Sequence, residues 1–180
     1  MILLARHGET DDNRDPLRIQ GHTDTPLNDT GRAQAEELAE RVAGEGIASL
    51  YTSGLSRARE TAAVVGHRLG LEPRVDDRLA EGYRGELEGL LWRDVARDDP
   101  ELYAAWRAAG DRFRFPGGES LREHQERTLA AISKVQATGE LPALLICHGG
   151  TIRVALCHTH ERGLDVFHDW DVPNVALVRL

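Results

Sequence analysis

Short runs of hydrophobic residues along the chain predict a set of buried strands. Residues 2–5 and 143–147 are uninterrupted apolar runs, and residues 47–51 and 175–180 form two further short stretches of strand character. Runs of this length between polar segments are typical of buried strands, and they are too short to cross a membrane. Another brief strand is expected at residues 74–75.

Between these runs, apolar residues recur at the i, i+3, i+4, i+7 spacing of core-facing helices. This spacing predicts four longer helices: one from about Thr30 to Val42, one that ends at Gly70, one from Ser120 to about Ala137, and one from about Thr151. Two shorter helices, separated by Pro100, are expected between residues 90 and 109. Strands that alternate with helices favour an α/β fold with a mostly parallel central sheet.

Composition and charge narrow the class of protein. The chain has 180 residues, of which 41% are hydrophobic and 29% charged, as expected for one soluble globular domain. Its net charge of −8 argues against a nucleic-acid partner, so a small anionic substrate would need a local cluster of arginines. Two cysteines cannot build a disulfide framework, and the first strand starts at Ile2 in place of a secretion signal, so a cytoplasmic protein is expected.

Polar residues with chemical potential follow three of the predicted strands. Arg6 and His7 follow the first run, Ser53 and Arg57 follow the run at 47–51, and His148 follows the run at 143–147. Ligands bind outside the carboxyl ends of strands in open α/β sheets, and in a mostly parallel sheet these ends share one edge. The sequence therefore predicts that two arginines and two histidines converge there.

Such a cluster suits the transfer of a phosphoryl group. An arginine fork pairs with two phosphate oxygens, and a neutral imidazole can attack phosphorus to form a covalent phosphoenzyme. The second histidine, if protonated, can donate to an equatorial oxygen in the transition state. The leaving alkoxide also needs a proton, for which Glu81 in the glycine-rich loop 78–89 is the candidate and Glu88 the competitor.

The motifs of the chain, taken in order, resemble those of the histidine phosphatase superfamily, also called the phosphoglycerate mutase-like family. The matching residues cover the chain from residue 2 to 180: Arg6-His7-Gly8-Glu9-Thr10 with Asn13, Arg18-x-Gln20-Gly21, Asp24-x-Pro26-Leu27, Ser53-x-Leu55-x-Arg57-Ala58-x-x-Thr61, Leu79-x-Glu81 with Gly85 and Glu88-Gly89, Pro116-Gly-Gly-Glu-Ser120, and His148-Gly-Gly-x-x-Arg153.

This resemblance implies a role for each matched residue. His7 would be the phosphorylated nucleophile and Glu81 the proton donor; Arg6, Arg57 and His148 would form the phosphate pocket; and Asn13, Gln20, Gly21 and Gly149 would touch phosphate or substrate. It also implies a three-layer α/β/α sandwich, a single domain over residues 1–180 with a lid at about 82–118, and no metal or organic cofactor.

Three departures from the mutase pattern of the family favour a phosphatase. The stretch Glu81-Gly82-Tyr83-Arg84-Gly85 lacks the arginine that follows the glutamate in mutases, and Gly150 stands where mutases carry asparagine. Mutases are also longer, with a tail that helps to exclude water, whereas this chain ends in its last strand. A cofactor-dependent phosphoglycerate mutase is the alternative reading.

Two other functions are considered. Phosphohistidine protein phosphatases of the family are smaller and tend to lack the lid segment. A non-catalytic module that binds phosphate or regulates a phosphoprotein would have lost its nucleophile or its acid, and this chain has both His7 and Glu81.

The substrate is expected to be a small phosphorylated metabolite: a sugar phosphate, a phosphoglycerate derivative or a nucleoside phosphate. No nucleic acid or membrane is expected as a partner, and the resemblance admits a homodimer. Five residues of the predicted lid are candidates to face the leaving group: Tyr83, Arg84, Trp92, Phe113 and Phe115. The aromatic ones could equally form the lid's own core, and Trp92 suits that core better.

A metal site is the last alternative. Cys157, His158, His160 and His168 are close in sequence, but their spacing matches no zinc pattern, so surface histidines are expected instead.

Overall fold

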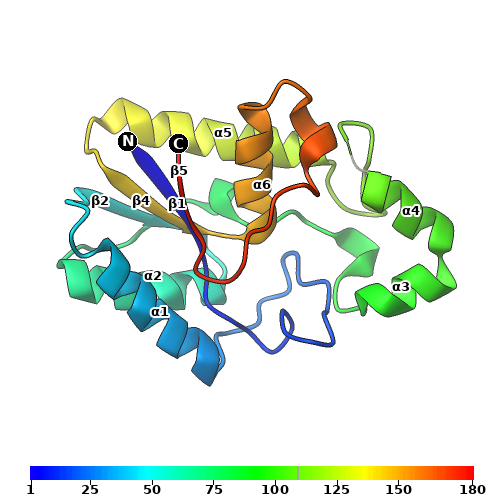
Figure 1. Cartoon of the computed structure of the whole chain (residues 1–180), viewed down its shortest axis with the longest axis horizontal. Coiled ribbons are helices and arrows are strands. Elements are labelled where there is room, and N and C mark those ends of the chain that lie inside the picture. Colours follow the sequence, from blue (N-terminus) through cyan, green and yellow to red (C-terminus); the bar gives the residue numbers. More distant parts are fainter. Residues whose placement is uncertain (109) are drawn as a thin grey trace.

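Five strands form one sheet in the computed structural model, which describes residues 1–108 and 110–180 (Figure 1). The strand order is β3–β2–β4–β1–β5, and the strands are β1 (Ile2–Arg6), β2 (Ser49–Thr52), β3 (Arg74–Val75), β4 (Ala143–Cys147) and β5 (Leu177–Arg179). Strands β1 to β4 pair in parallel, and β5 pairs antiparallel with β1. The predicted mostly parallel sheet is confirmed.

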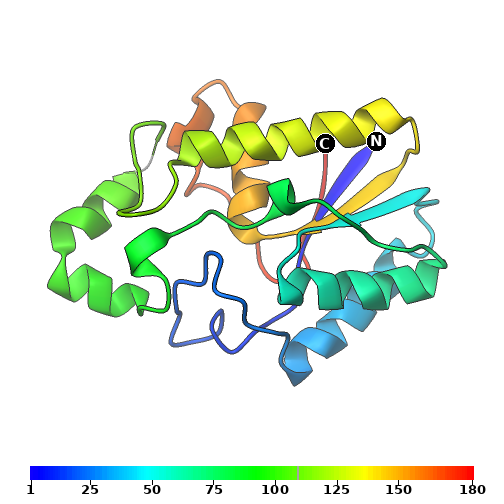
Figure 2. The same ribbon diagram turned by 180° about the vertical axis from the view of Figure 1, so that it is seen from behind.

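Four long helices cover the two faces of this sheet. Helices α1 (Asp29–Val42) and α2 (Ser56–Leu69) lie on one face, and α5 (Leu121–Thr138) and α6 (Gly149–His158) lie on the other (Figures 1 and 2). The chain therefore has the expected three-layer α/β/α architecture. Within the described ranges, no helix has the length and apolar character needed to span a membrane.

Strand β4 and residues 2–5 of β1 are apolar at every position because both of their faces are buried. In β1, Leu3 and Ala5 pack into the core beneath α1 and α2, whereas Ile2 and Leu4 pack into the core beneath α5 and α6. All four side chains are at most 1% exposed. This alternation fixes which face of the sheet each side chain covers, and the strand, which runs parallel to β4, delivers Arg6 and His7 to the carboxyl edge of the sheet.

The segment predicted as a lid contains two short helices, α3 (Trp92–Asp98) and α4 (Pro100–Ala108), as expected. The rings of Trp92 and Trp106 stack with centroids 5.7 Å apart, and Trp106 also packs against Phe115 at 4.8 Å and Phe167 at 5.3 Å. These aromatic contacts form a third hydrophobic core that ties α4 to the residues after α6. The predicted end of this helical segment, at residue 109, lies outside the described residues.

Two element boundaries differ from the sequence prediction. Helix α6 begins at Gly149 and not near Thr151, because tertiary contact outweighs the low helix propensity of glycine. A Cβ on Gly150 would lie 2.2 Å from Glu81 Oε1, so a side chain at this position would displace the Glu81 carboxyl group. Strand β5 begins at Leu177 because Val175 has a positive φ of 52°, which interrupts extended backbone.

Candidate active site

The predicted strand ends converge on one cavity. Its volume is about 410 Å³, and eight predicted site residues line it: Arg6, His7, Asn13, Gln20, Gly21, Arg57, Glu81 and Gly149. The ninth, His148, is fully buried behind the cavity wall, and its ring centroid lies 5.0 Å from that of His7. Topology thus brings together residues that are up to 143 positions apart, from Arg6 to Gly149.

His7 is held in one orientation by its own loop. Its Nδ1 lies 2.6 Å from the carbonyl oxygen of Gly8, so Nδ1–H donates to this oxygen and Nε2 carries the free lone pair. Burial lowers the pKa of His7 well below its ordinary value, and the charges of Arg57 and Arg6 lower it further. His7 is therefore a neutral imidazole with Nε2 available for attack.

The loop that carries His7 is packed too tightly for a side chain at position 8. A Cβ on Gly8 would lie 2.3 Å from the carbonyl oxygen of Gly31, at the start of α1. The Gly8 N–H donates to Thr61 Oγ1 at 3.1 Å, and Asn174 Nδ2 donates to the His7 carbonyl at 3.1 Å. Contacts with three distant segments fix the backbone on both sides of the imidazole.

Two arginines present guanidinium groups to the cavity. Arg57 donates through Nη1 to the Thr23 carbonyl at 2.9 Å and through Nη2 to the Gly21 carbonyl at 2.8 Å. Arg6 donates through Nη1 to the Val172 carbonyl at 2.7 Å. Burial lowers the pKa of Arg6 to about 10, with Arg153 and Arg57 among the lesser causes, so Arg6 stays charged at neutral pH.

Four buried nitrogens of the site have no hydrogen-bond partner within the described part of the chain: Arg6 Nε, Arg57 Nε, Asn13 Nδ2 and His148 Nδ1. Buried donors are almost always satisfied in folded proteins, and leaving one unpaired costs roughly 1–3 kcal/mol. A cluster of such donors beside two guanidinium groups is what an oxyanion with several acceptor oxygens would satisfy.

His148 can act as a donor without becoming charged, so the protonated form that the sequence analysis allowed for is not required. Ser53 Oγ accepts from the Leu55 N–H at 3.3 Å and lies 2.7 Å from His148 Nε2, to which it can donate. In the tautomer in which Ser53 donates, the imidazole proton lies on the unpartnered Nδ1. Burial lowers the pKa of His148 well below its ordinary value, and Arg57 and His7 add to the effect.

Glu81 reaches the cavity from the loop after β3. Its Oε1 accepts from the Gly82 N–H at 2.7 Å, and its Oε2 accepts from the Gly150 N–H at 2.9 Å, in the first turn of α6. Arg84 Nη2 lies 3.2 Å from Oε1. Burial opposes ionisation of this carboxyl, but the charge of Arg84 and the two backbone N–H groups hold the pKa of Glu81 below its usual range.

Glu88, the competing acid in the sequence, does not line the cavity. Its Oε1 accepts from the His22 N–H at 2.7 Å and from the Arg84 N–H at 3.0 Å, and its Oε2 accepts from Thr23 Oγ1 at 3.1 Å. Both oxygens are occupied by the loops that border the site. The geometry therefore favours Glu81 as the acid.

The lid residues divide between the cavity wall and the lid's own core, the two places that the sequence left open. Arg84 and Trp92 line the cavity, but Phe113 and Phe115 are buried in the aromatic core. Tyr83 is 42% exposed, and its ring is tilted against that of His22 with the centroids 5.2 Å apart. The four residues considered as a metal site have different surroundings. Cys157 is buried, His158 and His160 are exposed, and His168 lines the cavity. Within the described ranges, no group of three or more metal-ligating side chains converges.

Sequence reasoning missed His124, which is fully buried on α5 beside the acid. Its Nε2 lies 3.1 Å from Thr151 Oγ1 and 4.0 Å from Glu81 Oε1. Burial lowers the pKa of His124 well below its ordinary value, so it packs as a neutral ring. A histidine at a core-facing position of a helix carries no sequence signal that separates it from ordinary core, and only the contact with Glu81 reveals it.

With this geometry established, comparison with known proteins places the chain in a family. The family model for the histidine phosphatase superfamily (branch 1) matches residues 2–180, so the chain belongs to this superfamily. The fold and the paired histidines fit this class.

Some of the relatives are named as mutases and others as phosphatases. The chain is 38% identical over 157 residues to phosphoglycerate mutase-like protein 4 of Arabidopsis thaliana, covering 84% of this chain and 67% of that protein. It is 34% identical over 157 residues to the metal-independent phosphoserine phosphatase of the same plant, covering 84% of this chain and 65% of that protein. The matched regions therefore span about two thirds of both plant relatives.

A solved structure of a mycobacterial glucosyl-3-phosphoglycerate phosphatase, in complex with VO3, is similar over nearly the whole chain. Its TM-score is 0.89 at 30% sequence identity, and the match covers 98% of this chain and 88% of that one. The similarity extends through the α3–α4 segment and not only over the sheet and its covering helices.

Proposed function

We propose that this protein is a metal-independent phosphomonoesterase that hydrolyses a small phosphorylated metabolite through a phosphohistidine at His7. The family match and the relatives named as phosphatases support a phosphoric monoester hydrolase. The observation that carries the proposal is the cluster of unpartnered donors, on Arg6, Asn13, Arg57 and His148, beside the free Nε2 of His7.

In the first step, His7 Nε2 attacks phosphorus while the bond from phosphorus to the ester oxygen breaks. Arg6 and Arg57 bind the phosphoryl oxygens, and the His148 Nδ1–H adds a neutral donor. The leaving oxygen takes a proton from Glu81, and the product alcohol departs. The positive end of the α6 dipole, at Gly149, also favours the anionic group.

In the second step, a water molecule attacks the phosphohistidine, and Glu81, now a carboxylate, accepts a proton from this water. The bond from phosphorus to Nε2 breaks, inorganic phosphate leaves, and His7 returns to its neutral form. Glu81 is ionised in the free site because Arg84 and two N–H groups stabilise its charge. The proton for the first step therefore arrives with a substrate monoanion, or is taken up when the dianion repels the carboxylate.

Phosphoglycerate mutase is the second candidate function, because several relatives carry phosphoglycerate mutase names. A mutase must keep water from the phosphohistidine while its substrate reorients. The sequence differences at Gly82 and Gly150 favour the phosphatase.

We expect the protein to act in the cytoplasm. The free, buried Cys147 and Cys157 suit a reducing compartment. Two statements about partners stay predictions: nucleic acid is not a partner, and the protein can form a homodimer. We also propose that residues 1–180 form one domain and that the segment 82–118 serves as its lid.

The test is an assay of phosphate release from a panel of phosphomonoesters in the presence of a chelator. Conversion of 3-phosphoglycerate to 2-phosphoglycerate is followed in parallel. Release at an undiminished rate with chelator supports the proposal. Isomerisation with little release would favour the mutase, and loss of activity on chelation would contradict the metal-independent mechanism.

A further inference from the structure

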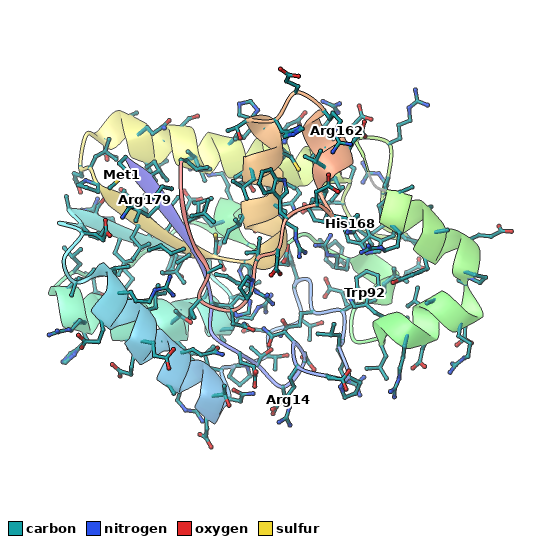
Figure 3. The ribbon with its side chains drawn as sticks, viewed as in Figure 1. Met1, Arg14, Trp92, Arg162, His168 and Arg179 are labelled. Atoms are coloured by element: carbon teal, nitrogen blue, oxygen red, sulfur yellow. The ribbon has the colours of Figure 1, made fainter. Side chains whose placement is uncertain are left out.

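The chain between β3 and α3 runs beside α5 and carries Glu81 between two short 3₁₀ helices (Figure 2). It ends at Trp92, the first residue of α3 (Figure 3). Backbone carbonyls in such a segment have few helix or strand partners, and buried carbonyls must find other donors. Here the carbonyls of Arg78, Ala80 and Glu81 accept from side chains of neighbouring elements. The position of the acid therefore depends on these side chains.

Arg127, on α5, supplies most of these donors. Its Nη1 donates to the Arg78 carbonyl at 2.8 Å and to the Ala80 carbonyl at 2.7 Å. Its Nη2 donates to the Glu81 carbonyl at 2.8 Å. One guanidinium group thus binds three carbonyls of the segment, including that of the acid. Because the guanidinium is a rigid planar fork, it sets the positions of these carbonyls relative to one another.

Glu119 fixes the orientation of this guanidinium group. Its Oε2 accepts from Arg127 Nε at 3.1 Å, and its Oε1 accepts from Arg127 Nη2 at 2.6 Å, which makes a bidentate pair. The backbone N–H of Glu119 also donates to the Tyr83 carbonyl at 3.0 Å. Glu119 belongs to the sequence motif of residues 116–120, for which the reaction steps above have no role.

Hydrogen-bond saturation distinguishes Arg127 from the arginines of the phosphate pocket. The Nε atoms of Arg6 and Arg57 have no partner within the described ranges, and both side chains line the cavity. Arg127 does not line it, and all five of its N–H donors are used within the protein. The side chains of Arg127 and Glu119 are only 21% and 18% exposed, so water competes weakly for their bonds. Arg127 therefore holds the protein and does not bind substrate.

The peptide group that Arg127 binds also positions the Glu81 carboxyl. The Glu81 carbonyl and the Gly82 N–H belong to one planar peptide group. This N–H donates to Glu81 Oε1 at 2.7 Å, so a shift of the carbonyl would move a donor to the carboxyl as well. A displacement of about 1 Å at a reacting group can cost about a hundredfold in rate.

We propose that Arg127 and Glu119 position the catalytic acid, by holding the peptide group between Glu81 and Gly82 so that the carboxyl faces the leaving oxygen. This inference rests on the proposed function, because the acid acts in that reaction. None of the five bonds of Arg127 goes to a residue that binds the phosphoryl group in this mechanism. The pair therefore affects protonation of the leaving group and not the attack by His7.

The experiment compares kcat/KM for p-nitrophenyl phosphate and for the alkyl phosphate that the wild type hydrolyses best. Arg127→Lys keeps the charge, but an ammonium group cannot bind three carbonyls and a carboxylate together. We expect it to lower kcat/KM about thirtyfold on the alkyl ester and less than about threefold on p-nitrophenyl phosphate, which needs little protonation. Glu119→Gln keeps an acceptor oxygen and should lower kcat/KM about fivefold on the alkyl ester alone. Arg122→Lys, at an exposed position of α5, is the matched control and should equal the wild type on both esters.

A double variant separates positioning from a general loss of structure. If Arg127 acts through Glu81, then Glu81→Gln combined with Arg127→Lys should be no slower on the alkyl ester than Glu81→Gln alone, because the acid is already absent. Each variant is assayed below its own unfolding midpoint, measured by circular dichroism.

Three results would overturn the inference: no loss in Arg127→Lys, equal losses on both esters, or losses that multiply in the double variant. In each case the phosphatase stands, because the wild type still releases phosphate. If the wild type hydrolyses neither ester, the proposed function itself fails.

Discussion

The backbone N–H of His22 donates to Glu88 Oε1 across 2.7 Å, and this contact joins the two loops that border the cavity. One loop supplies the Gly21 carbonyl that holds Arg57, and the other carries Glu81. The His22 imidazole adds a second link, since its Nε2 lies 2.8 Å from the Glu81 carbonyl oxygen. Glu88 is therefore a positioning residue, which sets the acid loop against the phosphate pocket.

Substitutions at Glu88 should separate this role from acid catalysis. Glu88→Gln keeps an oxygen that accepts from the His22 and Arg84 N–H groups, so most of the activity should survive. Glu88→Ala removes the link and should lower kcat/KM about tenfold, equally for an alkyl phosphate and for p-nitrophenyl phosphate. Steady-state kinetics of both variants on both esters is the measurement. If Glu88→Gln lost activity on the alkyl ester alone, Glu88 would be the acid.

Glu81→Gln should slow the two esters unequally, in contrast to the equal losses expected for Glu88→Ala. The amide cannot donate a proton to the leaving oxygen, so turnover of an alkyl phosphate should fall at least a hundredfold. Hydrolysis of p-nitrophenyl phosphate should fall far less, because its leaving group needs little protonation. Comparing kcat for the two esters measures the split. Equal losses on both esters would place the acid elsewhere.

His7→Ala should abolish turnover of every ester, with residual activity below roughly a thousandth of wild type, or about 4 kcal/mol of lost transition-state stabilisation. The prediction follows from its free Nε2 beside the phosphate donors. Acid-labile, base-stable incorporation of labelled phosphate in a rapid-quench experiment should occur in wild type and be absent in the variant. His67→Ala, a change on the exposed side of α2, is the control and should label normally. Labelling of His7→Ala would identify another nucleophile.

Stability should fall steeply as the pH drops below about 6.5. His7, His124 and His148 are buried, and burial holds the pKa of each well below its ordinary value. Below about pH 6.5 the unfolded chain binds protons at these positions and the folded chain does not, so each contributes a loss of about 1.4 kcal/mol per pH unit until its folded pKa is reached.

Urea unfolding at pH 7.5, 6.5 and 5.5 measures this effect. The free energy of unfolding should change little between the first two values and fall by several kcal/mol at the third. His124→Leu removes one of the three groups without touching the phosphate donors, and it should flatten the slope by about one third. A slope unchanged in this variant would show that His124 is protonated in the folded state.

The sequence by itself determined the layers of the fold and most of the residues that meet at the carboxyl edge of the sheet. The strands of residues 2–5 and 143–147 are apolar at every position because both faces are buried, which makes them readable without a structure. Parallel strands end at one edge of a sheet, so Arg6, Arg57 and His148 could be expected to converge before any distance was known.

Tertiary structure alone decided what these groups can do. The tautomer of His7 follows from the position of the Gly8 carbonyl, and the choice between Glu81 and Glu88 follows from loops more than 60 residues apart in sequence. The Gly150 N–H, in the first turn of α6, donates to Glu81, 69 positions away in sequence. The pairing of Arg107 with His168, 61 positions apart, likewise has no sequence signature. Hydrogen-bond partners and unpaired charges depend on distances in space, and periodicity along the chain encodes only which face of an element is buried.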